Sequence, residues 1–327
     1  SEKETRAFHE NPSTDKRAAL VDQLVASPGF DSHLFNWSAD LLRVQTRQEQ
    51  FGLGWHVWLR QSLAEDKPWD TMVTEMLGAT GHCATNPAVG YFLRDRNMQL
   101  DNFSNTMQVF LGRQIGCAQC HDHPFDDWSQ YDYYQMAAFG GGFTYRSMEA
   151  ADTVKRVTLD LREARKKDTP ASFAPKKNRR KADSREAERK RRQVEQKRRQ
   201  AEQRKAQATA RQLRPLFRDF NKNAVYDDPR RKLVLPDDYQ YKDGRPGEAI
   251  AAETLFGDPL KEVAPPERRE AFASWVSSPV NPYFTTVIAN RLWARTFGHG
   301  LHEPIDDWAE DTEPAHPEVL DHLETTM

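Results

Sequence analysis

The chain has 327 residues, of which 38% are hydrophobic and 29% are charged, and its formal net charge at pH 7 is −2. This length allows a sizeable core in one or two domains. No apolar run approaches the ~20 residues that a helix needs to cross a bilayer, so we expect no transmembrane segment. Three cysteines are too few for a disulfide scaffold.

Apolar residues recur at helical spacing along most of the chain, and this predicts a mainly α-helical protein with few strands. A first helix is expected over residues 16–26, where Ser27-Pro28-Gly29 ends it, and a second is expected to start near Asp31. A third covers residues 55–63. A fourth opens at Asp66-Lys67-Pro68, because proline is tolerated in the first turn of a helix.

The stretch 101–116 leads directly into a pair of cysteines. Its apolar residues predict an amphipathic helix with the cysteines at its C-terminal end. Residues 123–128 form a loop, since proline disfavours helix in the residue before it. Ser129, with Asp132 three residues later, resembles a capping box that opens the next helix.

The run Cys117-Ala118-Gln119-Cys120-His121 matches the C-x-x-C-H motif of covalent haem attachment. Two thiols about one helical turn apart can bond to the two vinyl groups of a haem, and the next histidine then lies under the iron. We therefore predict one haem c on Cys117 and Cys120, with His121 as the proximal iron ligand. Aromatic side chains that follow the motif are expected to wall the pocket: Phe125, Trp128, Tyr131 and Tyr134.

Three other interpretations of the cysteine pair compete with haem. A redox dithiol of the thioredoxin type would be surrounded by a βαβ pattern, which the sequence does not have. Zinc or another non-haem metal could use both cysteines with His121 and His123, although this spacing is tight for one tetrahedral ion. A disulfide between Cys117 and Cys120 would close a small strained ring.

The sequence does not determine the distal iron ligand. Methionine, histidine or an open position would each give the iron different chemistry. Candidates are Met136, Met148 and His316, and Met136 also fits a core role on the apolar face of its helix. An open position would permit a haem enzyme, with His123 as the adjacent acid–base group.

Residues 176–214 form a basic insertion with 17 Lys or Arg and 5 Asp or Glu. Single apolar residues recur every seven positions in it, which is too thin a stripe for a coiled coil. A solvated helix or a disordered insertion is one interpretation. The other is a docking arm for an acidic partner, a polysaccharide, nucleic acid or a membrane surface. The run has no aromatic residue, which argues against base stacking and so against nucleic acid.

The longest string, Phe110 to Asp126, closely resembles the planctomycete cytochrome-c-like domain. Further segments are similar to the same family or to the start of the domain of unknown function that usually follows it: residues 24–28, 66–69, 132–134, 137–139, 281–284, 290–293, 297–301 and 316–317. The resemblance covers nearly the whole chain except the basic insertion. It implies an exported bacterial protein with a haem, no established reaction, and a truncated second domain.

Three regions are therefore expected: a helical cytochrome-c-like domain over 1–150, a connecting region over 151–262, and the start of a truncated helical domain over 263–327. Within the connecting region, residues 231–241 are expected to be extended. The predicted function is electron transfer or redox support of a periplasmic pathway, with an unidentified redox partner. The alternative is a periplasmic binding or scaffold protein with a structural Cys/His metal site and a basic docking arm. Whether the protein is an enzyme is left open.

Overall fold

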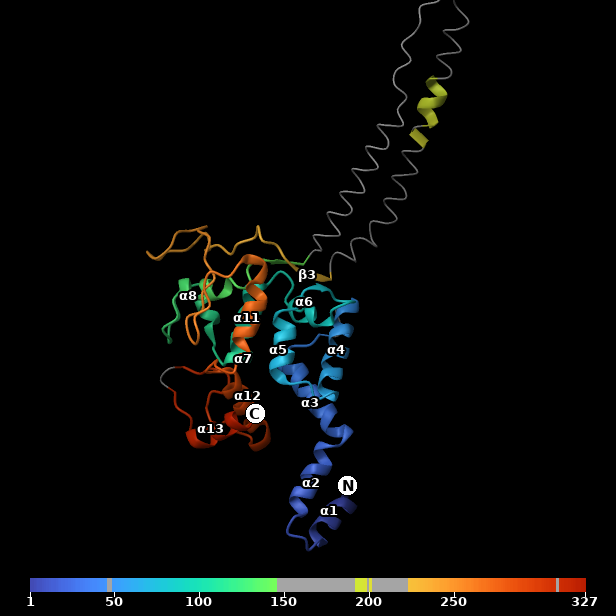
Figure 1. The fold of residues 1–327 in the computed structure, drawn as a ribbon, viewed down its shortest axis with the longest axis vertical. Helices are drawn as coiled ribbons and strands as arrows, with labels where there is room; N and C mark the ends of the chain where they lie inside the picture. Colours follow the sequence, from blue (N-terminus) through green and yellow to red (C-terminus); the bar gives the residue numbers. More distant parts are fainter. Residues whose placement is uncertain (46–48, 146–191, 199, 202–222, 310–311) are drawn as a thin grey trace, which may run out of the picture. The chain divides into compact units, whose positions relative to one another are not determined.

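The computed structural model describes residues 1–45, 49–145, 192–198, 200–201, 223–309 and 312–327 (Figure 1). The chain divides into two compact units, one formed by residues 1–144 with 225–327 and the other by residues 145–224. The second unit holds the whole basic insertion (176–214), of which only residues 192–198 and 200–201 are described, as exposed helix. The remaining predictions for the insertion and for Met148 fall outside the described residues.

The first unit begins with five helices, which confirms the mainly α-helical prediction: α1 (Glu2–Glu10), α2 (Lys16–Val25), α3 (Pro28–Leu41), α4 (Glu49–Ala64) and α5 (Trp69–Leu77). The start of α3 differs from the sequence prediction of a start near Asp31. The Ser27 side chain accepts a hydrogen bond from the Phe30 amide, and Pro28 occupies the first turn. Ser27-Pro28-Gly29 therefore both ends α2 and begins α3.

Short elements and two longer helices follow: β1 (Gly81–His82), η1 (Pro87–Val89), α6 (Gly90–Leu93), α7 (Gln99–Leu111), η2 (Ile115–Gln119) and α8 (Gln130–Ala137). The predicted helix over 101–116 is too long. Gly112 takes a left-handed conformation with φ of 64° and caps α7. The cysteine motif therefore lies on the separate 3₁₀ turn η2 and not at the end of α7.

A three-stranded sheet in the order β1-β3-β2 includes β2 (Phe143–Thr144) and β3 (Ala224–Asp227), which the sequence patterns did not predict. Strands β2 and β3 are antiparallel, with Phe143 opposite Asp227. This pairing joins residues on both sides of the basic insertion. Farther along, the predicted extended stretch makes one isolated antiparallel bridge, between Val234 and Ala249.

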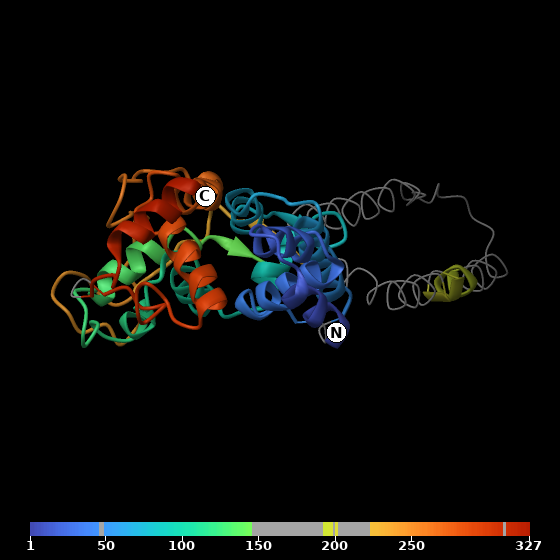
Figure 2. The same ribbon diagram turned by 90° about the horizontal axis from the view of Figure 1, so that it is seen from below.

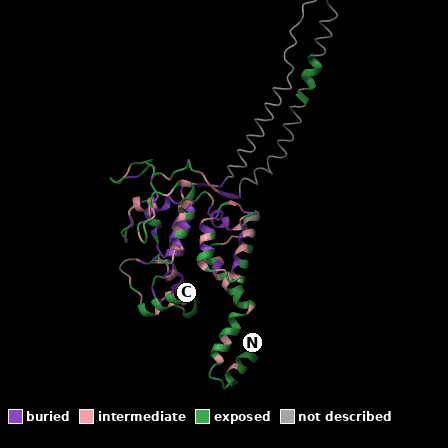
Figure 3. Ribbon diagram, viewed as in Figure 1, coloured by how far each residue is buried: buried purple, intermediate pink, exposed green. Residues whose placement is uncertain are grey.

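The C-terminal part contains η3 (Pro265–Glu267), α11 (Arg268–Val276), α12 (Phe284–Phe297) and α13 (Pro317–Thr326). Helix α11 packs on α5, and α12 contacts both α7 and α13. The red and orange ribbons of α13 and α12 lie side by side in Figure 2. Buried residues concentrate on the helices of this shared core, whereas α1 and α2 contain none (Figure 3). None of the helices in the described ranges has the length and apolar character needed to span a membrane.

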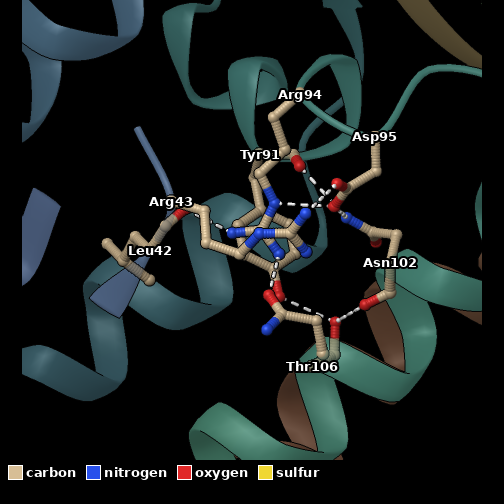
Figure 4. A network of polar contacts seen from close by, with 8 residues as sticks. Leu42, Arg43, Tyr91, Arg94, Asp95, Asn102 and Thr106 are labelled. Carbon is tan, nitrogen blue, oxygen red and sulfur yellow. Dashed lines mark hydrogen bonds and ion pairs between the residues drawn. The ribbon is translucent and has the colours of Figure 1, made fainter. Parts of the chain in front are cut away.

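A buried polar network holds α6 against α7 (Figure 4). The Arg94 side chain is fully buried and donates from Nε to Asp95 Oδ2 at 2.7 Å. It also donates to the Leu42 carbonyl, while Asn102 donates to the same Asp95 oxygen at 3.0 Å. Because each buried charge is paired and hydrogen-bonded, the network fixes the orientation of α7, the helix that leads to η2.

Candidate functional site

The turn η2 separates its side chains into two sets. Ile115 is 1% exposed and Ala118 is fully buried, so these two face the core. Cys117 and Cys120 are exposed and carry free thiols. Cysteine is usually among the most buried residue types, so two exposed thiols on one turn are unusual for a purely structural role.

One carbonyl group organises the motif. The Cys117 carbonyl oxygen accepts hydrogen bonds from the Cys120 amide at 3.2 Å and from the His121 amide at 3.4 Å. Both cysteines and the histidine therefore project from a single tight turn. The third cysteine, Cys83, is buried elsewhere and is also a free thiol.

The imidazole of His121 is exposed but has a defined hydrogen bond. Its Nδ1 lies 2.7 Å from the carbonyl oxygen of Asp122. A carbonyl oxygen can only accept, so Nδ1 carries a proton, and in the neutral ring Nε2 has the lone pair. This is the tautomer in which Nε2 can ligate a metal while the other ring nitrogen is held by the protein.

Asp122 anchors this histidine to the rest of the fold. Its Oδ1 accepts a hydrogen bond of 2.8 Å from the Gln130 amide, at the first turn of α8. Its own amide donates to the Tyr241 hydroxyl at 2.9 Å. A carboxylate at a helix N-terminus is favoured by the free amides and by the helix dipole. Asp122 is thus bound to α8 and to a distant segment together.

The start of α8 is as predicted. The Ser129 side chain accepts from the Asp132 amide, and the Asp132 carboxylate accepts from the Ser129 amide, which is a complete capping box. The buried Gln130 side chain donates to the Gln119 carbonyl at 3.1 Å. The helix start therefore contacts the middle of the motif at Gln119 and the residue that follows it, Asp122.

Residues 236–247, which we call the strap, lie against α8. The strap is closed at its base, where the Leu235 amide donates to Glu248 and its carbonyl accepts from Gly247, at 2.9 and 3.0 Å. The hydroxyl of buried Tyr239 donates to Asp243 across the strap. A Cβ on Gly244 would lie 2.5 Å from Leu235 Cδ1 and 3.3 Å from the Tyr131 ring, so glycine permits close packing at the base of the strap and beside α8.

Sequence analysis missed the strap as part of the site. The only signal in the sequence is the Tyr239-Gln240-Tyr241 string in an otherwise polar stretch, some 120 residues after the motif. Such a long-range contact leaves no periodic pattern.

Two tyrosines near the motif, Tyr134 and Tyr239, have pKa values raised by burial and by nearby negative charges. Burial, followed by the negative charges of Cys120 and Asp238, raises the pKa of Tyr134. Burial, the hydrogen bond to Asp243, and the nearby charges of Asp243 and Asp122 raise the pKa of Tyr239. These phenols stay protonated and remain hydrogen-bond donors at neutral pH.

The four aromatic residues predicted to wall a haem pocket have separate surroundings. Phe125 is 92% exposed at the tip of the loop after the motif, whereas Trp128 is buried edge-on against Phe256. Tyr131 is half-buried beside the strap, and Tyr134 is buried on α8.

The candidate distal ligands are also apart from the exposed turn. Met136 is fully buried in α8, which favours the core role. His316 is exposed immediately before α13. Within the ranges that the structure describes, no group of three or more His, Cys, Asp or Glu residues is arranged to hold a metal ion.

The donor set of the turn fits the proximal half of a c-type haem. Such a group needs two accessible thiols on one turn and one imidazole nitrogen, and it does not need a cluster of three protein ligands. Cys117, Cys120 and His121 supply these atoms, and the Asp122 carbonyl holds the imidazole in the required tautomer.

Comparison with known families finds two matches. Residues 1–144 match the PSCyt2 model, described as a protein of unknown function (DUF1549), a planctomycete cytochrome-c-associated domain. Residues 268–327 match the PSD1 model, described as a protein of unknown function (DUF1553). The N-terminal and C-terminal regions are therefore each similar to a family of unknown function, which agrees in part with the resemblance noted in the sequence. No curated protein and no solved structure matches the chain.

Proposed function

We propose that the protein is an exported monohaem c-type protein that carries single electrons in a periplasmic pathway. The observation that carries this proposal is the display of Cys117, Cys120 and His121 on the outer side of one turn whose Ile115 and Ala118 face the core. A turn built only for packing would place its thiols inside.

The residues of the turn have distinct roles in this proposal. Cys117 and Cys120 would hold the haem through two thioether bonds, each made by addition of S–H across one vinyl group. His121 offers Nε2 to the iron, while Nδ1 donates to the Asp122 carbonyl. When bound, the haem supplies reversible one-electron chemistry at its iron.

The proposed partners follow from charge. The redox partner is a protein of the same exported pathway, and the basic insertion over 176–214 recruits an acidic surface. Support for export comes from the planctomycete-type domain pair and from the haem motif itself. Met136 is packed in the core, so it is not proposed as an iron ligand.

Haem attachment is tested by producing the full chain together with a haem-maturation system. We expect a pyridine haemochrome spectrum of the c type and one covalent haem per chain. Cys117→Ala and Cys120→Ala should each lose one thioether bond, and the double variant should lose covalent haem. Cys83→Ala is the matched control, because this third thiol is buried elsewhere, and it should keep the haem.

A colourless protein with stoichiometric zinc would contradict the haem proposal. That result would favour the alternative, a periplasmic scaffold whose Cys/His site is structural. Deletion of residues 176–214 tests the insertion separately: in a haem-loaded protein, loss of partner binding with an intact haem spectrum would identify the insertion as the docking element.

A further inference from the structure

Tyr241 belongs to neither of the two matched regions, yet its hydroxyl reaches the motif. It accepts the Asp122 amide hydrogen at 2.9 Å. We propose that Tyr241 is a positioning residue for His121: it holds the Asp122 backbone so that the Asp122 carbonyl fixes the tautomer and orientation of the imidazole. This role rests on the proposed haem attachment only where the iron ligand is concerned.

Asp122 is held by two hydrogen bonds, one on its amide and one on its carboxylate. Its amide is bound to the strap through Tyr241, and its carboxylate is bound to the Gln130 amide at 2.8 Å. With the amide and the side chain both held, little freedom remains for the carbonyl, which accepts from His121 Nδ1 at 2.7 Å.

The strap that carries Tyr241 is itself held by internal hydrogen bonds. The hydrogen bond from Tyr239 to Asp243 crosses the strap, and the base is closed by the Leu235 pairings with Gly247 and Glu248. Gly244 packs closely on the Leu235 side chain at the base and lies beside the Tyr131 ring on α8. The strap and α8 therefore form one support, and both anchors of Asp122 arise from it.

The hydrogen bond on Nδ1 affects how well Nε2 can bind a metal. A histidine that ligates a metal donates its other ring N–H to a carbonyl, carboxylate or water, which sets the tautomer and raises the basicity of the ligating nitrogen. The Asp122 amide is at an exposed residue, and water could satisfy it without any protein partner. The Tyr241 hydroxyl, from a residue about 120 positions away, is therefore not needed to solvate this amide. Its effect is to fix the position of the Asp122 backbone.

The test uses the haem-free full chain and the Tyr241→Phe variant. Long-range proton–nitrogen NMR correlations of the His121 ring, recorded where the ring is neutral, report the ratio of its two tautomers. We expect the Nδ1–H form to predominate in the wild type. Loss of one hydrogen bond in the support should lower its ratio to the Nε2–H form by about two- to tenfold.

Two further variants make the result decisive. Asp122→Ala removes the second anchor and should change the tautomer ratio in the same direction. Tyr226→Phe is the matched control, the same substitution on β3, and should leave the ratio unchanged. An unchanged ratio in Tyr241→Phe, with helical content equal to the wild type by circular dichroism, would overturn the positioning role.

This measurement is independent of haem. If the maturation system attaches no haem but the tautomer ratio still responds to Tyr241→Phe, the positioning role stands and the proposed function fails. If haem is attached and the ratio does not respond, the outcome is reversed. In the haem-loaded protein, where Nε2 would bind the iron and the ring proton stays on Nδ1, Tyr241→Phe should shift the reduction potential by weakening the hydrogen bond from Nδ1 to the Asp122 carbonyl.

Discussion

Arg269 and Asp227 form a two-pronged ion pair, with Nε and Nη2 of the guanidinium 2.6 and 2.7 Å from the two carboxylate oxygens. Arg269 is 3% exposed and also donates to the Ala79 carbonyl. Its guanidinium lies over the Phe92 ring at 5.0 Å. Arg269 lies in the region similar to PSD1 (268–327), and it contacts both β3 and the region similar to PSCyt2 (1–144). These three segments therefore share a core.

Arg269→Met should destabilise the protein by about 3 kcal/mol, because it leaves the Asp227 carboxylate without its partner in a largely buried position. The free energy of unfolding in urea measures this loss. Arg230→Ala is the matched control: Arg230 pairs with the adjacent Asp228, but its side chain is 76% exposed where that of Arg269 is 3% exposed, and pairs of exposed charges contribute little. Equal unfolding midpoints for the Arg269 and Arg230 variants would contradict the role of the buried pair.

Gly90→Ala should destabilise the protein by about 1–3 kcal/mol through overpacking. A Cβ at this position would overlap Cβ and Cγ of Trp55, which is fully buried and has no freedom to move aside. Thermal unfolding is the measurement. Gly29→Ala, in the first turn of α3, has only the Ser27 hydroxyl at 3.5 Å and should be neutral or stabilised by up to ~1 kcal/mol. Similar melting temperatures for the two variants would argue against this packing.

Local patterns predicted the elements that local chemistry determines. The capping box at Ser129, the helix over 16–26 and the helical end of the chain follow from neighbouring residues, and the structure has them. The end of α7 was missed because apolar spacing continues to Ile115, whereas Gly112 takes a left-handed conformation that ends the helix earlier.

The supporting parts of the site could not be predicted in this way. The motif residues are contiguous, so the sequence reveals Cys117, Cys120 and His121 directly. Tyr241 contacts Asp122 across 119 positions, and β2 pairs with β3 across the basic insertion. Such contacts depend on the tertiary arrangement and leave no repeat in one sequence.

The stability of the wild-type protein should fall in alkaline solution, because a buried tyrosine resists ionisation. Burial raises the pKa of Tyr133 above the ordinary value of 10.0, and nearby Tyr134, Asp101 and Cys120 add to this. Above about pH 10 the unfolded chain releases this proton and the folded chain keeps it. The contribution of Tyr133 to the free energy of unfolding should therefore be level below pH 10 and decrease as the pH rises further.

Urea midpoints measured across this pH range test the sign. Tyr133→Phe cannot release the proton, so its free energy of unfolding should fall less steeply above pH 10 than that of the wild type. It should also be less stable throughout, because the hydroxyl donates to the Leu100 carbonyl at 2.9 Å. Parallel curves for the variant and the wild type would show that Tyr133 is not a source of the alkaline loss.

The rate of reaction with a thiol reagent should distinguish Cys83 from Cys117 and Cys120. It therefore tests whether the two motif thiols are the ones that hold the haem. In the haem-free folded chain, a thiol reagent should modify Cys117 and Cys120 quickly, because both are exposed. Cys83 is 5% exposed, and burial raises the pKa of its thiol, so it should react only after unfolding. Counting fast and slow equivalents by mass spectrometry gives two and one.

The haem-loaded chain should then show no fast thiol at all, because both sulfurs are in thioether bonds, while the slow equivalent from Cys83 remains. Cys83→Ala should abolish the slow equivalent and leave the two fast ones of the haem-free chain. Two fast thiols in a coloured, haem-containing protein would mean that the haem is held without covalent attachment, and the roles assigned to Cys117 and Cys120 would be wrong.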